Sequence, residues 1–540
     1  MTHVILLMAQ VNSTLGNIEA NSRIIQTIIA EHQESHDVIL FPELCLTGYP
    51  PEDLLFRNEL HQRVEEQLKL IANATQDCHV IVGHPQLEKE RCFNSATVFY
   101  QGERIATYDK QCLPNYSVFD EKRYFTAGKK TGLLTVKSMK LALCICEDIW
   151  QEQPALLAKQ AGADCILCLN ASPFYADKLS LRQEVISKRA KEHQLPIIYV
   201  NAVGGQDELV FDGLSFAVDK SGTIKSQSNA FKTSLDTITI TKNSLSGEMA
   251  NIPSVESLIY QALVSGTRDY VTKNGFKGAL IGLSGGIDSA LTLAIAVDAL
   301  GHDNVHAVMM PSRYTADMSN EDALLEAQAL NTKYSTLPIE PIFKQFLAGL
   351  SDEFAGLKTD TTEENIQARV RGTLLMALSN KTGKIVLTTG NKSEMAVGYA
   401  TLYGDMAGGF AVLKDVPKTL VYRLAKYRNS LSAVIPERVI TRAPSAELAE
   451  DQADQDSLPD YAILDKILHY YVECNMGVEE ICEKGIAAED VKKIIRLIDI
   501  NEYKRRQAPP GVRISQRAFG RDWRYPITSG FHHALYTERT

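Results

Sequence analysis

Short apolar runs alternate with longer amphipathic stretches along the first half of the chain. Val4–Ala9 is uniformly apolar, which predicts a buried strand, and isoleucines recur at helical spacing in Ile18–Ala30. Two strand patterns, 96–100 and 104–108, are separated by Gln101-Gly102-Glu103, which predicts a hairpin. The alternation predicts a layered α/β structure that is partly mixed because of the hairpin.

The second half repeats the alternation without an obvious hairpin. Lys277–Gly282, Val305–Met310 and Lys384–Leu387 predict short buried strands, and helical patterns separate them. Strands that alternate with helices in this way predict a doubly wound parallel sheet. Ligands of such a sheet bind beyond the carboxyl ends of its strands.

Thr241–Pro253 breaks the periodicity with small and polar residues. A chain of 540 residues is too long for one core. We therefore expect a first domain over 1–245, a linker over 246–256 and a second domain over 257–540.

Composition narrows the class of protein. A net charge of −10 argues against a nucleic-acid-binding surface. No apolar run approaches the roughly 18 residues of a membrane span, and the chain begins without a signal-peptide pattern. The ten cysteines lack CxxC pairs, so neither a zinc site nor a disulfide framework is indicated. These features predict a cytoplasmic protein that contacts neither nucleic acid nor membrane.

Glu43, Lys110 and Cys146 each follow a predicted strand. A nearby ammonium favours the thiolate form of a cysteine, and a carboxylate can act as its general base. No histidine stands in a comparable position, so a papain-like Cys–His pair is the weaker interpretation. Each residue alone is unremarkable.

Together the three residues, in the contexts FPEL, DKQCLP and ICEDIW, resemble the triad of the nitrilase (carbon–nitrogen hydrolase) superfamily. The resemblance covers about residues 3–240 and implies an αββα sandwich. Cys146 would attack an amide, Glu43 would be the base and Lys110 would stabilise the oxyanion. Cys144 is interpreted as core packing. Glu121 resembles the supporting second glutamate of the superfamily. An equally good interpretation is that it belongs to a solvated charge cluster.

A glycine-rich turn joins a predicted strand to a helix at Leu283–Ala290. This arrangement points backbone N–H groups and a helix N-terminus at a phosphate, and Gly285 and Gly286 permit a close approach. No lysine follows the glycines, which excludes a P-loop, and their spacing does not fit the G-x-G-x-x-G pattern of a Rossmann turn. Ser284–Ser289 resembles the SGGxDS loop of the ATP-pyrophosphatases, which implies that ATP is cut between its α and β phosphates and an acyl group is adenylated.

Asp288 and Glu394 are candidate ligands for Mg²⁺, because two carboxylates with phosphate oxygens suit its octahedral coordination. Ser393-Glu394 could instead simply begin a helix. Lys418 could neutralise phosphates or be solvated.

The motifs SGGIDS, NIQARVRG, TTGNKSE, YGDMAGGF and DVPKT, followed by Glu502–Pro510, occur in one order. Together they look like the NAD+ synthetases, and a nitrilase-like domain in front marks the glutamine-dependent form. The resemblance implies an adenine nucleotide α-hydrolase-like second domain and the conversion of deamido-NAD+, ATP and glutamine to NAD+, AMP, pyrophosphate and glutamate. It also implies Mg²⁺, an internal ammonia tunnel and a homo-oligomer.

The same resemblance assigns residues to each substrate. Those for ATP are Leu283, Ser284, Gly285, Gly286, Ile287, Asp288, Ser289, Ala290 and Thr389. Those for deamido-NAD+ are Asn365, Glu394, Asp405, Lys414 and Lys504, and those for the charged groups of glutamine are Tyr116, Ser172 and Lys178.

Other interpretations stay open at this point. One is an amidase whose ATP domain only supports it, and another is a non-catalytic nucleotide sensor or scaffold. GMP and asparagine synthetases are the nearest rivals among adenylating enzymes, although they usually carry a different glutaminase domain. The acidic stretch Glu447–Asp460 is expected to be a mobile surface segment or a lid.

Overall fold

The structure, a computed structural model, describes residues 3–444, 447–449 and 459–531, and the chain forms two compact units, Met1–Ser254 and Val255–Thr540. The segment expected to be a polar boundary is partly structured. Strand β15 (Leu245–Ser246) pairs antiparallel with β14 (Ser234–Ile240) because buried Leu245 joins the apolar core of the first unit.

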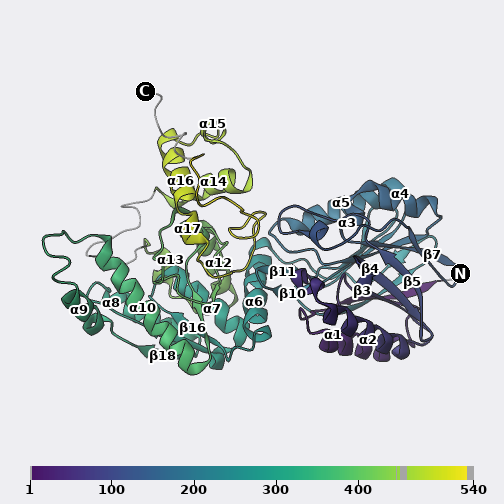
Figure 1. The fold of residues 1–540 in the computed structure, drawn as a ribbon, viewed down its shortest axis with the longest axis horizontal. Helices are drawn as coiled ribbons and strands as arrows, with labels where there is room; N and C mark the ends of the chain where they lie inside the picture. Colours follow the sequence, from purple (N-terminus) through teal and green to yellow (C-terminus); the bar gives the residue numbers. More distant parts are fainter. Residues whose placement is uncertain (1–2, 445–446, 450–458, 532–540) are drawn as a thin grey trace. The chain divides into compact units, whose positions relative to one another are not determined.

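The first unit consists of two β-sheets packed face to face between two layers of helices (Figure 1). One sheet has the order β15-β14-β1-β2-β3-β4-β5 and the other β13-β12-β9-β8-β7-β6. Three apolar clusters lie between the four layers, which confirms the predicted αββα sandwich. The further strands are β1 Val4–Gln10, β2 Val38–Leu40, β3 His79–Glu88, β4 Arg91–Tyr100, β5 Glu103–Asp109, β6 Gly132–Val136, β7 Met139–Ile145, β8 Cys165–Asn170, β9 Ile197–Asn201, β12 Phe216–Val218 and β13 Ile224–Gln227, with a separate hairpin of β10 Val203–Gln206 and β11 Leu209–Asp212.

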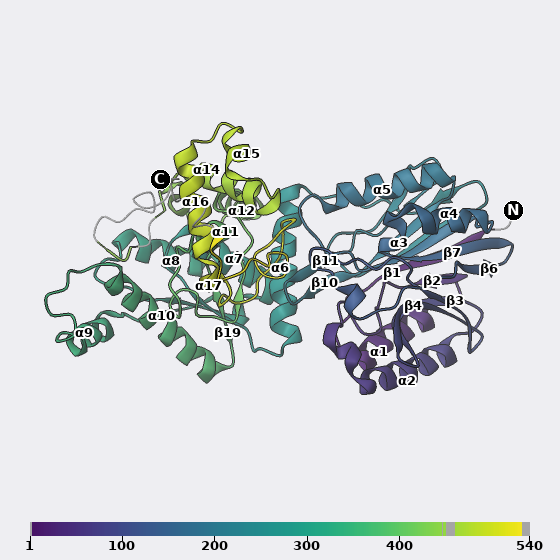
Figure 2. The same cartoon turned by 45° about the horizontal axis from the view of Figure 1, so that its top comes forward.

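The helices of this unit cover the outer faces of the two sheets. Both views place α1 and α2 on one side and α4 and α5 on the other (Figure 2). The bounds are α1 Ile18–His32, α2 Asn58–Ala74, α3 Glu147–Trp150, α4 Glu152–Gln160 and α5 Lys178–His193.

The second unit is built on a five-stranded sheet of order β18-β17-β16-β19-β20 in which all pairs are parallel. β16 lies in the centre, and later strands are added on both of its sides, which is the doubly wound topology that the sequence predicted. The point where the strand order reverses is therefore beside β16, where ligands of such sheets bind. The strands are β16 Ala279–Gly282, β17 Val305–Met309, β18 Lys333–Thr336, β19 Ile385–Thr388 and β20 Phe410–Ala411.

Helices surround this sheet, and a C-terminal helical layer packs on α11. Apolar side chains of α14 and α16 bury Ala396 and Val397 of α11, so the helix that carries Glu394 is anchored to the C-terminal layer. The bounds are α6 Val255–Lys273, α7 Ile287–Leu300, α8 Asp317–Ala329, α9 Glu340–Gly349, α10 Thr361–Thr382, α11 Lys392–Val397, α12 Lys418–Leu431, α13 Glu437–Thr441, α14 Tyr461–Leu468, α15 Val478–Cys482, α16 Ala488–Ile500 and α17 Glu502–Arg505.

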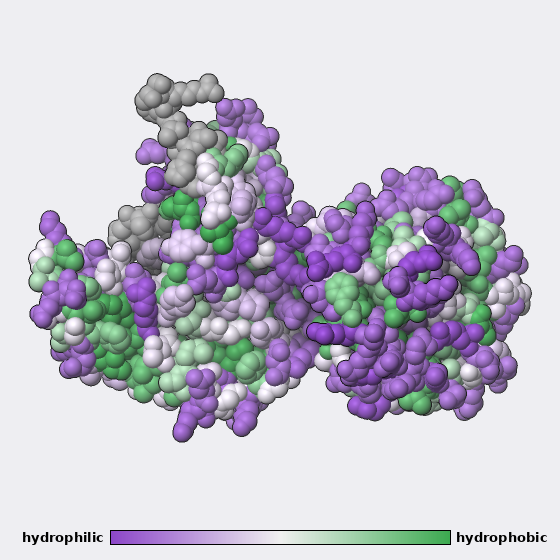
Figure 3. Space-filling view, viewed as in Figure 1, coloured by the Kyte–Doolittle hydropathy of each residue, from purple (hydrophilic) through white to green (hydrophobic). Residues whose placement is uncertain are grey.

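The face drawn in Figure 3 is largely hydrophilic, with smaller groups of apolar side chains between the polar ones. Among the described residues, no helix has the length and apolar character needed to cross a membrane.

Glu326 on α8 is a buried acid. Its side chain is fully buried, and neither carboxylate oxygen has a hydrogen-bond partner within the part of the chain that the structure describes. Burial, together with Asp322 one helical turn earlier, raises the pKa of Glu326 well above its usual range. A carboxyl group whose pKa is higher in the folded state destabilises the fold as pH rises above the unfolded-state pKa of about 4.3.

We therefore expect Glu326→Gln to stabilise the protein at neutral pH. The gain should be near zero at pH 4.5 and grow by about 1.4 kcal/mol per pH unit up to the folded-state pKa. Urea unfolding at pH 5 and pH 7 measures it. Glu321→Gln, which changes an exposed glutamate on the same helix, is the matched control. A gain for Glu326→Gln that does not grow with pH would contradict this account.

Candidate functional site

Cys146 stands at the turn between β7 and α3. Its backbone φ is +47°, a region that residues other than glycine rarely adopt. Its N–H donates to the carbonyl oxygen of Leu169 on the adjacent strand at 2.9 Å, which fixes the turn to the sheet. A strained turn that the sheet holds in this way keeps the thiol in one orientation.

Glu43 and Lys110 follow β2 and β5, and their side chains form a buried ion pair. Lys110 Nζ donates to Glu43 Oε1 at 2.7 Å and to Glu121 Oε1 at 2.9 Å. The three residues are at most 4% exposed. Glu121 therefore belongs to the buried group and is not part of a solvated charge cluster.

Burial and the neighbouring carboxylates favour a protonated thiol at Cys146. Burial raises the pKa of Cys146 well above its usual range, Glu43 adds to this effect, and Lys110 opposes it. Lys110 by itself lowers the pKa of Cys146, as the sequence led us to expect. Burial and the carboxylates raise that pKa by more than Lys110 lowers it. Burial by itself would lower the pKa of Lys110, yet Glu121 and Glu43 raise that pKa well above its usual range. The site thus favours a neutral thiol near a buried carboxylate and a buried ammonium.

Three contacts that sequence reasoning missed hold the two carboxylates. Asn94 Nδ2 donates to Glu43 Oε1 at 2.8 Å, and the N–H of Ala171 donates to Glu43 Oε2 at 3.0 Å. The hydroxyl of Tyr49 donates to Glu121 Oε1 at 2.9 Å. A buried asparagine, a tyrosine and a backbone amide from distant segments carry no local sequence signal of this role.

Asp148 joins the segment after Lys110 to the turn at Cys146. It is fully buried, and its two oxygens accept four hydrogen bonds. The donors are the N–H groups of Ile145, Gln111 and Cys112 and the hydroxyl of Tyr108, at 2.7–3.0 Å. One carboxylate thus fixes two of the three strand ends relative to each other.

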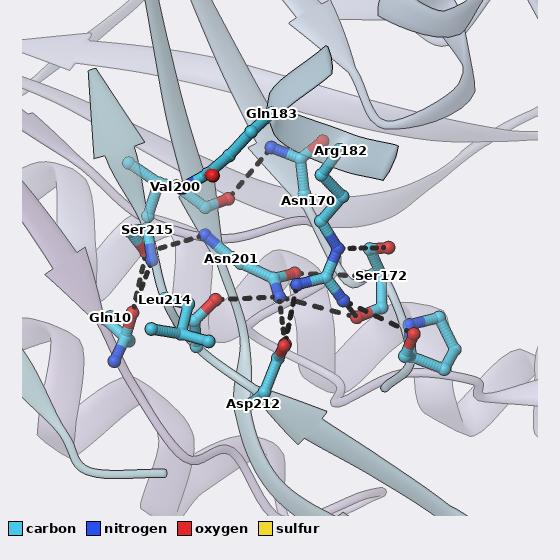
Figure 4. A network of polar contacts seen from close by, with 12 residues as sticks. Gln10, Asn170, Ser172, Arg182, Gln183, Val200, Asn201, Asp212, Leu214 and Ser215 are labelled. Carbon is cyan, nitrogen blue, oxygen red and sulfur yellow. Dashed lines mark hydrogen bonds and ion pairs between the residues drawn. The ribbon is translucent and has the colours of Figure 1, made fainter. Parts of the chain in front are cut away.

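Ser172, one of the residues assigned to glutamine, lies two positions after β8. It directly follows Ala171, whose N–H holds Glu43, so it lies at the same end of the sheet as Glu43. The residue is buried, and it forms part of a polar network with Arg182 and Asp212 (Figure 4).

Tyr116 and Lys178, the other two residues assigned to glutamine, lie on a loop and at the start of α5. The hydroxyl of Tyr116 donates to Glu147 Oε2 at 2.8 Å, and Tyr116 is near enough to Cys146 for the two groups to interact electrostatically. Lys178 Nζ lies 4.1 Å from the ring centroid of Trp150. Lys178 is half-buried, and its ammonium is held by the aromatic face. Its positive charge suits an anionic group of a small ligand.

In the second unit, the glycine turn follows β16 and opens into α7. Gly285 has φ +79°, and a Cβ there would lie 2.4 Å from the carbonyl oxygen of Ser319, so the turn requires glycine. The N–H of Gly286 donates to Ser284 Oγ at 3.2 Å, and Ser284 Oγ lies 3.1 Å from Ser289 Oγ. Hydroxyls and a helix N-terminus meet here, as a phosphate site requires.

A cavity of about 320 Å³ lies beside this turn. The structure brings nine of the assigned residues together on its wall. They are Leu283, Ser284, Gly286, Ile287, Asp288, Ser289, Thr389, Glu394 and Asp405. Of the other residues assigned to ATP and deamido-NAD+, Gly285, Ala290, Asn365, Lys414 and Lys504 are not among the described residues that line it.

Lys418 lies between the two carboxylates that were predicted to bind Mg²⁺. Its Nζ donates to Asp288 Oδ2 at 2.5 Å and to Glu394 Oε1 at 3.0 Å, and Asn391 Nδ2 donates to Asp288 Oδ1 at 2.9 Å. Burial by itself would lower the pKa of Lys418, but the two carboxylates raise it. Lys418 is therefore not solvated. Two carboxylates that converge on one cation also fit a divalent ion with phosphate ligands, although the described residues contain no cluster of three or more potential metal ligands.

Three of the residues assigned to deamido-NAD+ form a group around Thr401. Its hydroxyl donates to Asn365 Oδ1 and its N–H to Asp405 Oδ1, both at 2.6 Å. Burial raises the pKa of Asp405 to about 6, and Lys504 opposes this effect. Lys414 is buried beside Gly511, apart from the cavity wall.

Arg371, to which sequence reasoning assigned no role, and Glu447, the first residue of the expected acidic segment, both line the cavity. Arg371 Nε donates to the carbonyl oxygen of Met310 at 3.0 Å, and burial lowers the pKa of Arg371 to about 10. Glu447 accepts from Ser319 Oγ at 2.6 Å and from the N–H of Ala316 at 3.2 Å. The start of the expected acidic lid thus contacts the cavity, whereas residues 450–458 lie outside the described residues.

Comparisons with known proteins cover both units. A family model for NAD synthase matches residues 259–508, and one for carbon-nitrogen hydrolase matches residues 8–246. The glutamine-dependent NAD(+) synthetases of Xanthomonas campestris pv. campestris and Acinetobacter baylyi are 48% and 47% identical, over 97% of this chain and 97% and 98% of theirs. A solved structure of glutamine-dependent NAD+ synthetase from Acinetobacter baumannii with ADP has a TM-score of 0.80 and 45% identity, over 98% of this chain and 99% of that one.

Proposed function

The chain belongs to the family of glutamine-dependent NAD(+) synthetases, and on that premise we propose how its residues divide the reaction. The enzyme adenylates deamido-NAD+ with ATP and amidates it with ammonia from glutamine, giving NAD+, AMP, pyrophosphate and glutamate. The observation that carries the proposal is the joint presence of two sites in one chain: the Glu43–Lys110 pair near Cys146 in the first unit, and the glycine turn beside a cavity in the second.

In the first unit, Glu43 takes the proton of the Cys146 thiol as the sulfur attacks the amide carbon of glutamine. Lys110 donates to the oxyanion of the tetrahedral intermediate, because its ammonium is held in place before the reaction by Glu43 and Glu121. Glu43 then returns the proton to the leaving ammonia, and a thioester remains. Glu43 next takes a proton from water as the water attacks the thioester; the C–S bond breaks, glutamate forms, and Glu43 returns the proton to the Cys146 sulfur.

In the second unit, the glycine turn and the N-terminus of α7 bind the phosphates of ATP. The nicotinate carboxylate of deamido-NAD+ attacks the α-phosphorus, the bond between the α and β phosphates breaks, and pyrophosphate leaves. Ammonia then attacks the acyl carbon, and AMP leaves with the carboxylate oxygen. Lys418 neutralises charge beside the turn. Asp288 and Glu394 would hold Mg²⁺, which supplies further charge neutralisation when it is bound.

Lys178→Met tests the assignment of the glutamine site. Removing the ammonium should raise the KM for glutamine by about 10- to 100-fold, because a hydrogen bond to a charged group contributes about 1.5–3 kcal/mol. The kcat at saturating glutamine and the activity with ammonium salts should change little. Lys188→Met, on the exposed face of the same helix, is the matched control. An unchanged KM would remove Lys178 from the glutamine site.

The overall assignment is tested by incubating the protein with deamido-NAD+, MgATP and glutamine and quantifying NAD+ and AMP. We expect them to form one for one. Hydrolysis of amides at full rate without ATP and without NAD+ formation would favour the amidase alternative. A cytoplasmic location, which composition predicts, and a homo-oligomer, which the family resemblance implies, are part of this proposal.

A further inference from the structure

Arg182 is a fully buried arginine that the proposed mechanism does not use. It lies on α5, one helical turn after Lys178, and its side chain points into the network shown in Figure 4. Its partners are Asp212 at the end of β11 and the segment Ser172-Pro173 after β8. It therefore connects the helix that begins with one candidate glutamine ligand to the segment that carries another.

Each nitrogen of the Arg182 guanidinium donates to an acceptor within the protein. Nε donates to Ser172 Oγ at 3.1 Å, one terminal nitrogen donates to both oxygens of Asp212 at 2.7 and 2.9 Å, and the other donates to the carbonyl oxygens of Ser172 and Pro173 at 2.8 and 3.3 Å. The guanidinium is therefore engaged at all three of its nitrogens by acceptors within the protein, and it is fully buried. Any effect of Arg182 on glutamine therefore passes through a neighbouring residue.

Ser172 is that neighbour, because hydrogen bonds at three of its atoms fix its position. Its N–H donates to Asn201 Oδ1 at 2.9 Å, its carbonyl accepts from Arg182, and its hydroxyl oxygen accepts from Arg182 Nε. A hydroxyl has one proton to donate. Since an N–H already occupies a lone pair of Ser172 Oγ, the hydroxyl proton is directed away from Arg182, toward the side on which the buried hydroxyl of Tyr199 also interacts with Ser172 and a ligand oxygen can accept it.

The local charges favour an anionic partner for that donor. Asp212 neutralises Arg182 within the network, since the two form an ion pair in which neither side chain is exposed. Lys178, at the start of α5, adds a positive charge that also acts on Asp212. A hydroxyl donor and an ammonium together suit the carboxylate of an amino acid.

We propose that Arg182 is a positioning residue that orients Ser172 as a donor to the α-carboxylate of glutamine and thereby sets the affinity for glutamine. The proposal rests on the proposed function of Ser172 in glutamine binding. It assigns Arg182 no contact with the substrate and no role in the attack by Cys146.

A double-mutant cycle between Ser172→Ala and Arg182→Lys tests this proposal. Lysine keeps a positive charge near Asp212 but cannot supply the five directed donors. Arg182→Lys should raise the KM for glutamine about tenfold, change kcat less than twofold and leave ammonium-driven NAD+ formation unchanged. In the Ser172→Ala background it should change the KM less than twofold, because the group on which it acts is absent.

Arg189→Lys is the matched control. Arg189 is on the same helix, and its guanidinium donates to Glu192 and to the carbonyl oxygen of Trp150. Because neither partner is Ser172, the Arg189→Lys enzyme should have the wild-type KM for glutamine. Equal effects of Arg182→Lys in both backgrounds, or a fall in kcat without a change in KM, would overturn the proposal. If Ser172→Ala itself leaves the KM unchanged, the assignment of Ser172 under the proposed function fails and the proposal falls with it.

Asp212→Asn provides a second measurement if circular dichroism shows that Arg182→Lys does not fold. It retains the guanidinium and one acceptor oxygen but removes the paired charge. The KM for glutamine should rise about threefold in the presence of Ser172 and remain unchanged in the Ser172→Ala background. An unchanged KM in both backgrounds would overturn the proposal.

Discussion

Cys146→Ala should reduce glutamine-dependent NAD+ formation by about 10⁴-fold or more and leave ammonium-driven formation near the wild-type rate. The large effect follows because the thioester requires the sulfur, and removing a covalent nucleophile abolishes that route altogether. Ammonium salts bypass the first unit, so the second unit reports whether the variant is folded. The measurement compares NAD+ formed with each nitrogen source under saturating MgATP and deamido-NAD+.

Cys144→Ala is the control for this experiment. Cys144 lies on β7 two residues before the proposed nucleophile and is buried, so the change removes a neighbouring sulfur. We expect its glutamine-dependent rate to stay within a few-fold of the wild type. A Cys146→Ala enzyme that still uses glutamine, or a Cys144→Ala enzyme that does not, would show that the nucleophile is misassigned.

Lys418→Met should reduce NAD+ formation by about 10²- to 10³-fold with either nitrogen source. Lys418 is the cation between Asp288 and Glu394, and it lines the cavity beside the glycine turn. Without it the two carboxylates repel each other, and charge that develops on the leaving pyrophosphate loses a partner. Steady-state NAD+ formation with glutamine and with ammonium measures the effect.

Two controls accompany this variant. Lys426→Met changes an exposed lysine of the same helix and should leave both rates unchanged. Glutamine hydrolysis by Lys418→Met, measured without ATP, should equal that of the wild type, since the site of hydrolysis is in the other unit. A loss confined to the glutamine-dependent reaction would contradict the assignment of Lys418 to the synthetase site.

Local patterns in the sequence predicted the elements that carry the two sites. The apolar run before Cys146 and the run before Ser284 are strands β7 and β16, and each turns into a helix as predicted. Strand ends and glycine turns have local signatures because hydrophobic periodicity and the special conformations of glycine are properties of neighbouring residues. The family resemblance then supplied what each site does.

The partners of the site residues could not be predicted in the same way. Lys418 was left undecided between a phosphate contact and a solvated side chain, and it is buried between two carboxylates from other segments. Arg182 had no role at all, although its ion pair with Asp212 crosses from a helix to a distant strand. Such pairs depend on tertiary packing, which a single sequence does not encode in local spacing.

Burial also reversed the expected direction of the pKa shift of Cys146. A lysine near a cysteine suggested a thiolate, but the pKa of Cys146 is raised because the thiol is buried and Glu43 lies near it. Which of the opposing effects is larger depends on how many charges surround the group and how deeply it is buried. The resulting neutral thiol makes the base essential, which supports the role proposed for Glu43.

The most direct test of the central claim is the transfer of isotope from glutamine labelled with ¹⁵N in its side-chain amide. The protein is incubated with labelled glutamine, deamido-NAD+ and MgATP, and the NAD+ is examined by mass spectrometry while AMP is quantified. The account predicts one ¹⁵N in the carboxamide of each NAD+ and one AMP per NAD+. Unlabelled NAD+, ADP in place of AMP, or no NAD+ at all would contradict it.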